Sequence, residues 1–280
     1  MFPFADANPT HRTAIVTYTI ILLNVVAFFL FSRLDPETQT LVTVNYGFIP
    51  QRIEQLSDPN KIVRVPVSDP RFIAVGFNQV EQQQDVVDLP ADPKNIYASL
   101  LTCMFMHGGW MHLIGNMWFL FIFGNNIEDR LGHVLYFLFY IGGGLAASAT
   151  HWAIDPQSAI PVIGASGAVA AVLGAYAVTY PFHRVHTLIF LFVFVTIIDL
   201  PALAVLGVWF LGQLLEAYSS IGMKVGGGVA FWAHVGGFVA GAVVMPLLTW
   251  VLPPYIPPSV DGPAEANPGD DDFLRRRLGS

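Results

Sequence analysis

The chain has 280 residues and a net charge of −7, and 54% of its residues are hydrophobic whereas only 12% are charged. With a mean hydropathy of +0.56, this composition excludes an ordinary soluble domain and indicates a polytopic membrane protein. The sequence has no basic stripe and no cluster of Lys and Arg interleaved with aromatic residues, which argues against nucleic acid as a partner.

The first part of the chain predicts one membrane span and a long loop. Residues 1–12 are polar, and residues 13–32 form an apolar run that is long enough to cross about 30 Å of hydrocarbon. No small-residue cleavage site follows this run, so we expect a retained span and not a signal peptide. Residues 33–98 are rich in Pro, Gln and Asp and lack a span-length apolar run, so we expect a large loop outside the bilayer.

Five further spans complete a predicted membrane domain, residues 13–252, which precedes a tail at residues 253–280 that we expect to be disordered. The spans lie at about 110–126, 133–153, 162–180, 201–218 and 229–252. The apolar stretch 186–198 is short for a crossing and is closed by Asp199 and Pro201, so we expect it to be interfacial or re-entrant. The predicted fold class is therefore all-α, a polytopic membrane bundle of six transmembrane helices.

The charges of the short loops predict the topology. Six spans place both termini on one side of the membrane, and Lys and Arg are enriched in cytoplasmic loops. The basic residues on the side of the termini are Arg12, Arg130, Arg184 and residues 275–277, and Lys224 is the exception on the other side. We therefore expect a cytoplasmic N-terminal segment and tail, and an extracytoplasmic loop at 33–98.

In this topology, spans two, four and six run in the same direction, and each carries polar residues near its start. Span two has His112 and Asn116, four residues apart on one helical face, span four has Ser166 between small residues, and span six has His234. Each group also has a structural interpretation: helix-packing serine, interhelical hydrogen-bond pair or satisfied core histidine. Because polar groups at membrane depth are costly, three of them at matched depth favour a site, with Ser166 as its nucleophile.

Small residues explain how these spans approach one another. Ala170 and Gly174 in span four, and Gly237 and Gly241 in span six, form small-xxx-small surfaces. Gly237 and Gly241 lie on the same helical face as His234, so the face that packs against span four also carries the imidazole.

Four ordered motifs carry a resemblance to a known family. They are FMHGGWMHLIGN at 105–116, FGNNIEDRLG at 123–132, GASG at 164–167 and AHVGG at 233–237, after an NPT lead-in at 8–10. Together they resemble the rhomboid family of intramembrane serine proteases, in particular its bacterial members. The resemblance covers essentially every predicted span.

The resemblance implies a catalytic dyad in which Ser166 is the nucleophile and His234 its general base. It also implies an oxyanion hole formed by His112, Asn116 and the Ser166 backbone N–H. Gly164 and Gly167 would keep the serine turn open. We find no Asp or Glu within spans two, four or six that could orient the imidazole, and Asp155 in a nearby loop is a weak candidate.

The sequence departs from the family at one position near the dyad. Many members carry an aromatic residue four positions after the nucleophile, where it packs on the catalytic histidine, and this chain has Ala170. Glu128 and Arg130 match a Glu-x-Arg pair of the family, which we interpret as structural. The glycine run 226–228 suits a mobile cap over the site.

The predicted function is hydrolysis of a peptide bond in or near the transmembrane helix of membrane-protein substrates, without metal or other cofactor. We expect an integral protein of a bacterial plasma membrane, with its active site toward the extracytoplasmic face, in contact with the lipid bilayer. Two alternatives remain open. One is a catalytically inactive rhomboid-like protein that binds membrane clients. The other is a transporter in which His107, His112, His151 and His234 form a proton or metal path.

Overall fold

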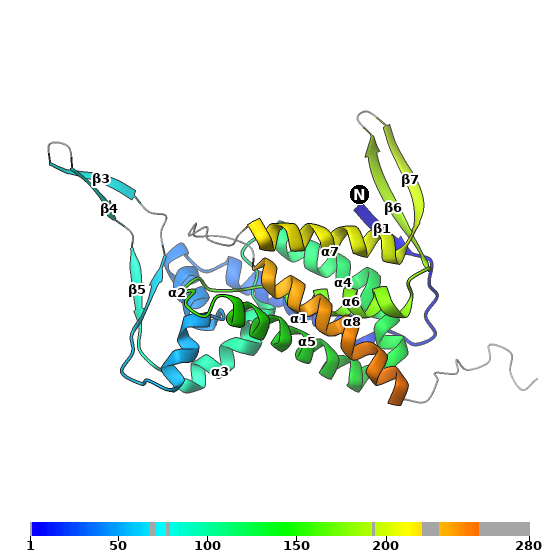
Figure 1. The fold of residues 1–280 in the computed structure, drawn as a ribbon, viewed down its shortest axis with the longest axis horizontal. Helices are drawn as coiled ribbons and strands as arrows, with labels where there is room; N and C mark the ends of the chain where they lie inside the picture. Colours follow the sequence, from blue (N-terminus) through cyan, green and yellow to red (C-terminus); the bar gives the residue numbers. More distant parts are fainter. Residues whose placement is uncertain are drawn as a thin grey trace, which may run out of the picture.

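The computed structural model describes residues 2–67, 71–76, 79–83, 85–191, 194–219 and 230–251. The body of the protein is a bundle of long helices (Figure 1). In chain order the bundle helices are α1 (Ile15–Ser32), α4 (Trp110–Leu131), α5 (His133–Ile154), α6 (Ser166–Thr179), α7 (Ala202–Ser219) and α8 (Phe231–Val251). The expected cap at 226–228 and the tail at 253–280 lie outside the described residues.

Within the described ranges, four of these helices are long and apolar enough to cross a membrane: α1, α5, α7 and α8. The protein is therefore an integral membrane protein. The other two helices differ in length or composition, since α6 has only 14 residues and α4 ends in Glu128, Asp129 and Arg130. The count of six spans stays a prediction.

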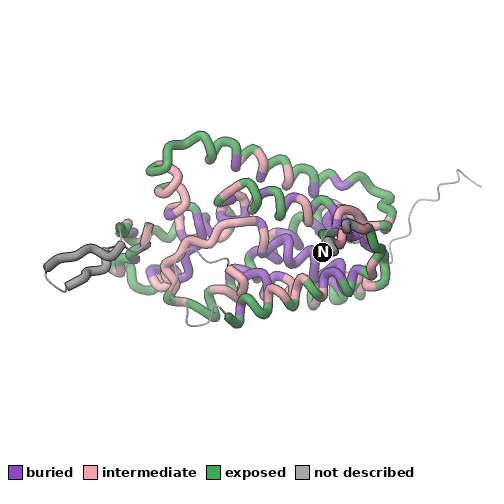
Figure 2. The backbone as a smooth tube through the Cα atoms, turned by 90° about the horizontal axis from the view of Figure 1, so that it is seen from above, coloured by how far each residue is buried: buried purple, intermediate pink, exposed green. Residues whose placement is uncertain are grey.

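The short helix α6 lies at the centre of the bundle. All of its residues from Gly167 to Ala177 are buried, and Figure 2 shows buried residues gathered in the middle of the bundle and exposed residues along its outer faces. A helix that is enclosed by protein on all sides has no need of a wide apolar face toward lipid. Small side chains suit this position, because they allow neighbouring helices to pack against every face.

The closest contact of α6 is with α8, where glycines face backbone atoms. A Cβ atom on Gly241 would lie 1.9 Å from the carbonyl oxygen of Ala171, and one on Gly174 would lie 2.0 Å from the carbonyl oxygen of Phe238. A Cβ on Gly237 would lie 2.2 Å from the carbonyl oxygen of Gly167. Any larger residue at these positions would push the two helices apart, so the glycines set the distance between α6 and α8.

The apolar stretch at 186–198 forms strands, and its interfacial or re-entrant position stays a prediction. It belongs to two antiparallel strands, β6 (Arg184–Leu191) and β7 (Phe194–Pro201), and β6 also pairs with β1 (Phe2–Asp6). Its β-branched and aromatic residues favour strands, and the partner strand lies at the N-terminus, far away in sequence. The fold is thus mostly helical, and the all-α expectation omitted its strands.

The three-stranded sheet and the long loop occupy opposite ends of the bundle (Figure 1). The loop contains α2 (Pro36–Tyr46), a 3₁₀ turn η1 (Pro50–Leu56), β2 (Val63–Pro66), β3 (Arg71–Gly76), β4 (Gln79–Gln83) and β5 (Val86–Leu89). Helix α3 (Pro93–Thr102) begins within it, and α3 and η2 (Cys103–Phe105) lead on to α4. It has a small core of its own, made of Val44, Ile49, Val63, Val65 and Leu89. Strand β2 pairs with β5, and β3 pairs with β4.

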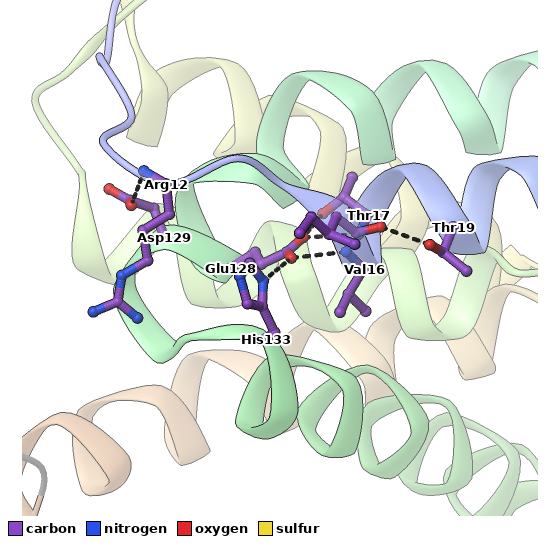
Figure 3. A network of polar contacts seen from close by, with 8 residues as sticks. Arg12, Val16, Thr17, Thr19, Glu128, Asp129 and His133 are labelled. Carbon is purple, nitrogen blue, oxygen red and sulfur yellow. Dashed lines mark hydrogen bonds and ion pairs between the residues drawn. The ribbon is translucent and has the colours of Figure 1, made fainter.

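A buried carboxylate ties the start of α1 to the end of α4 (Figure 3). Glu128 is fully buried and accepts hydrogen bonds from the backbone N–H groups of Val16 and Thr17 at 2.8 and 2.7 Å and from Thr17 Oγ1 at 2.7 Å. His133 Nδ1 lies 2.6 Å from the same carboxylate. An anion at a helix N-terminus satisfies otherwise unpaired N–H groups, so Glu128 has the structural role predicted for it.

We expect Gly241→Ala to lower the free energy of unfolding by about 1–3 kcal/mol, because its methyl group would overlap the backbone of α6. Gly142→Ala in α5 is the matched control, since no atom lies within 4 Å of its added methyl group. This control should be neutral or stabilising by about 0.5–1 kcal/mol. Thermal unfolding in detergent measures both changes, and equal stability of the two variants would contradict the proposed role of Gly241.

We expect Glu128→Ala to lower the free energy of unfolding by about 3 kcal/mol, because the buried N–H groups of Val16 and Thr17 would lose their acceptor. Glu216→Ala on the exposed surface of α7 should change it by no more than about 0.5 kcal/mol. The same unfolding assay compares them. A Glu128→Ala protein as stable as the Glu216→Ala control would show that the tie between α1 and α4 contributes nothing.

Candidate active site

Ser166 and His234 meet between α6 and α8. Ser166 is the first residue of α6, and His234 lies in the first turn of α8. The Oγ atom of Ser166 is 2.7 Å from Nε2 of His234, within hydrogen-bond distance. Only 8% of His234 is exposed, and Ser166 is half-buried at the N-terminal end of the central helix.

The glycines predicted to support the pair lie directly around it. Gly237, about one turn after His234, packs on the carbonyl oxygen of Gly167, which directly follows Ser166. Gly241 repeats this contact one turn further on, against the carbonyl oxygen of Ala171. A Cβ on Gly167 would also lie 2.6 Å from Cβ of Ala147 in α5. The close approach of α6 and α8 therefore brings the hydroxyl of Ser166 within reach of the imidazole of His234.

The turn before Ser166 is shaped by Gly164. Its φ angle of +129° lies in a region that L side chains rarely adopt, and its N–H donates a 2.8 Å hydrogen bond to the carbonyl of Cys103. Just before it, Val162 exchanges two backbone hydrogen bonds with Phe48 of the long loop, at 2.7 and 3.0 Å. Backbone contacts to the loop region thus fix the path of the chain into Ser166.

His112 lies against this turn. A Cβ atom on Gly164 would be 2.6 Å from Nε2 of His112 and 3.5 Å from Oγ of Ser166, so Gly164 leaves room for the imidazole beside the serine. The ring of His107 packs edge-on against that of His112, with centroids 5.0 Å apart. His112 is therefore held on the Ser166 side of α4.

Asn116 lies one turn further along α4, and 8% of it is exposed. Its Nδ2 is buried and has no hydrogen-bond partner among the described residues. A buried amide donor without a partner is costly in a resting protein and is typical of functional sites. The first backbone N–H groups of α6, beginning with that of Ser166, also lack partners within the helix. Three kinds of donor therefore belong to this region: an imidazole, an amide and a helix N-terminus.

The second nitrogen of His234 has a partner that the sequence analysis missed. Nδ1 lies 2.5 Å from Oε1 of Gln213 in α7. Asp155, the weak candidate for this role, is not a partner, because the two ring nitrogens of His234 bond to Gln213 and Ser166. The sequence did not indicate Gln213, because it is an amide and not a carboxylate, and because a single Gln in an apolar helix belongs to no recognisable motif.

Two aromatic rings lie beside His234, although Ala170 stands at the position where many members of the family have an aromatic residue. The ring centroids of Trp209 in α7 and Phe231 in α8 each lie 6.2 Å from that of His234, at interplanar angles of 33° and 87°. Ala170 instead packs near Gly237 at the contact between α6 and α8. In the described residues, no group of three or more His, Cys, Asp or Glu side chains is placed to hold a metal ion.

The protein is thus a membrane-integral helical bundle that holds a hydrogen-bonded Ser–His pair between two of its helices. The Rhomboid domain matches residues 94–251, which is more than half of the chain and contains all of the predicted site residues. The protein therefore belongs to the rhomboid family.

Several curated proteins are similar to the chain over part of its length. RHOMBOID-like protein 5 of Arabidopsis thaliana is 27% identical over 173 residues, which is 58% of this chain and 49% of that protein. Rhomboid-like protein 11, chloroplastic, of the same plant is 38% identical over 28% of this chain and 27% of its own length. The putative rhomboid protease YdcA of Bacillus subtilis is 33% identical over 28% of this chain and 38% of its own. The chain thus spans about a quarter to a half of these relatives.

Proposed function

We propose that the protein is an intramembrane serine endopeptidase that cleaves membrane-protein substrates in or near their transmembrane helices. The observation that carries this proposal is the 2.7 Å contact between Ser166 Oγ and His234 Nε2. A hydroxyl hydrogen-bonded to a buried imidazole, which is in turn bonded through its other nitrogen, has the arrangement of an activated nucleophile. Family membership and the relative named as a putative rhomboid protease support the same function.

In the proposed reaction, neutral His234 takes the proton of Ser166 as Oγ attacks the carbonyl carbon of the scissile peptide bond. The carbonyl oxygen becomes a tetrahedral oxyanion, for which His112, Asn116 and the Ser166 backbone N–H are the proposed donors. When the C–N bond breaks, the imidazolium returns the proton to the leaving amine. Water then attacks the acyl-enzyme with His234 again as the base, and the serine is released.

The buried position of the dyad limits the substrates. A peptide bond within a regular helix is hydrogen-bonded and sterically shielded, so a substrate segment must unwind to reach Ser166. Single-span proteins with Gly, Ala or Pro near the outer end of the helix are the expected class, and Gly and Pro lower the cost of unwinding. We therefore propose transmembrane-helix proteins as the substrate class and the lipid bilayer as the route of approach.

The proposed orientation follows from the two ends of the bundle. The turn into Ser166 contacts Cys103 and the long loop, whereas β1 and the β6–β7 hairpin lie at the other end (Figure 1). The bias of Lys and Arg assigns the end with β1 to the cytoplasm. In a bacterial plasma membrane, the membrane predicted from the sequence, the dyad would then open toward the extracytoplasmic face.

Labelling by a fluorophosphonate probe tests the dyad without knowledge of the substrate. We expect the detergent-solubilised protein to react with the probe, and Ser166→Ala and His234→Ala to lose the reaction, because one lacks the nucleophile and the other its base. Ser57→Ala and His183→Ala, on exposed residues outside the bundle helices, are the matched controls and should label normally. If folded wild-type protein is neither labelled nor able to cleave model transmembrane substrates, an inactive client-binding protein or a transporter replaces the protease.

Substitution of the proposed oxyanion donors tests the rest of the site. We expect His112→Ala and Asn116→Ala each to lower kcat by about 10²–10³-fold with little change in KM, because the donors act on charge that develops in the transition state. Asn125→Ala, at the other end of α4, is the matched control and should keep full activity. A rise in KM at constant kcat would assign the two residues to substrate binding.

A further inference from the structure

The contact between His234 and Gln213 determines which nitrogen of the imidazole carries the proton. Oε1 of Gln213 is a carbonyl oxygen and can only accept a hydrogen bond, so Nδ1 of His234 must be the donor across their 2.5 Å contact. A neutral imidazole has one N–H, which leaves Nε2 unprotonated. Nε2 is the atom that faces Ser166 Oγ at 2.7 Å, so the hydroxyl donates to it. This is the tautomer that a general base needs before the reaction begins.

Nothing on α6 performs this task. One turn after Ser166, the side chain is the methyl group of Ala170, which is fully buried against α8. The imidazole instead meets two side chains of α7, Trp209 beside its ring and Gln213 at Nδ1. These residues are four positions apart and so lie on one face of α7. A single face of one helix therefore supplies both the ring contact and the hydrogen bond that hold His234.

We propose that Gln213 is a positioning residue that fixes the tautomer and ring orientation of His234, in the place that a carboxylate takes in Ser–His–Asp triads. This inference rests on the proposed protease function and extends it. Trp209 restricts the tilt of the same ring. Because the amide is uncharged, Gln213 orients the base at membrane depth without the cost of burying a carboxylate charge.

The position of Gln213 couples the base to a peripheral helix. Few residues of α7 are buried, namely Ala202, Val205, Leu206 and Ala217, and leucines along it are exposed. The helix lies along one edge of the bundle (Figure 1). His234 is carried by α8, which packs tightly on α6 through glycines. The two functional atoms thus belong to the closely packed pair α6 and α8, whereas the group that sets the protonation of His234 belongs to α7.

Two substitutions of Gln213 test this role. Gln213→Leu removes the acceptor at similar volume. We expect the rate of fluorophosphonate labelling and kcat to fall roughly 10- to 100-fold. This range lies between the effect of losing one neutral hydrogen bond and the larger effect of the wrong histidine tautomer in a Ser–His–Asp triad. Gln213→Glu keeps an acceptor at the same place and should retain the rate to within about threefold. Leu211→Ala, on an exposed residue of the same helix, is the matched control and should leave the rate unchanged.

The tautomer itself provides a readout that does not require activity. In ¹⁵N-histidine NMR spectra of the full chain in detergent, with the His234 signals assigned from a His234→Gln spectrum, we expect a protonated Nδ1 and an unprotonated Nε2. Gln213→Leu should shift protonation toward Nε2, whereas Gln213→Glu should preserve the wild-type pattern. A wild-type spectrum with the proton on Nε2 overturns the inference, even if Gln213→Leu fails to fold.

The outcomes separate the inference from the proposed function. If wild-type protein is labelled and Gln213→Leu is labelled equally fast with an unchanged tautomer, the dyad stands and the role of Gln213 is refuted. If wild-type protein is not labelled but His234 shows the Nδ1–H tautomer and loses it in Gln213→Leu, the positioning contact stands and the protease function fails.

Discussion

The site depends on the glycines at the contact between α6 and α8. Gly174, Gly237 and Gly241 each face a backbone carbonyl at a distance that a Cβ could not occupy. In a bilayer, helices gain little from burying apolar surface against each other, so packing at such short range is a main source of association. The same contact carries Ser166 at the start of one helix and His234 in the first turn of the other, and thereby converts helix packing into the alignment of two reactive atoms.

Much of the candidate site was accessible from sequence because its residues sit in short local patterns. His112 and Asn116 share a helical face, Ser166 is flanked by glycines, and His234 precedes a small-xxx-small surface. Gln213 could not be found in this way, since it is a lone amide in an apolar helix and its role depends on how α7 packs against α8. The strands β6 and β7 were missed for a similar reason: the pairing with β1 joins segments that are far apart in the chain.

The criteria of length and hydropathy for a span fit the outer helices better than the central one. Helices such as α1 and α7 expose most of their surface, as a lipid-facing helix must, and they meet the criteria of length and composition for a span. Helix α6 is enclosed by its neighbours, and α4 ends in the charged residues that bind the N-terminal segment. Such helices are surrounded by protein instead of lipid, so their length and hydropathy are weak guides to their depth in the membrane.

The Glu128 contact also has a consequence for biosynthesis. Helix α1 is synthesised well before the acceptor for its N-terminal N–H groups, which follows 111 and 112 residues later. Strand β1 is separated from its partner β6 by a still longer stretch of chain. During insertion, α1 therefore spans the bilayer as a separate helix whose end is solvated by water or lipid headgroups. Its attachment through Glu128 takes place only once the end of α4 has been made, so the N-terminal end of α1 stays unattached until the next bundle helix is in place.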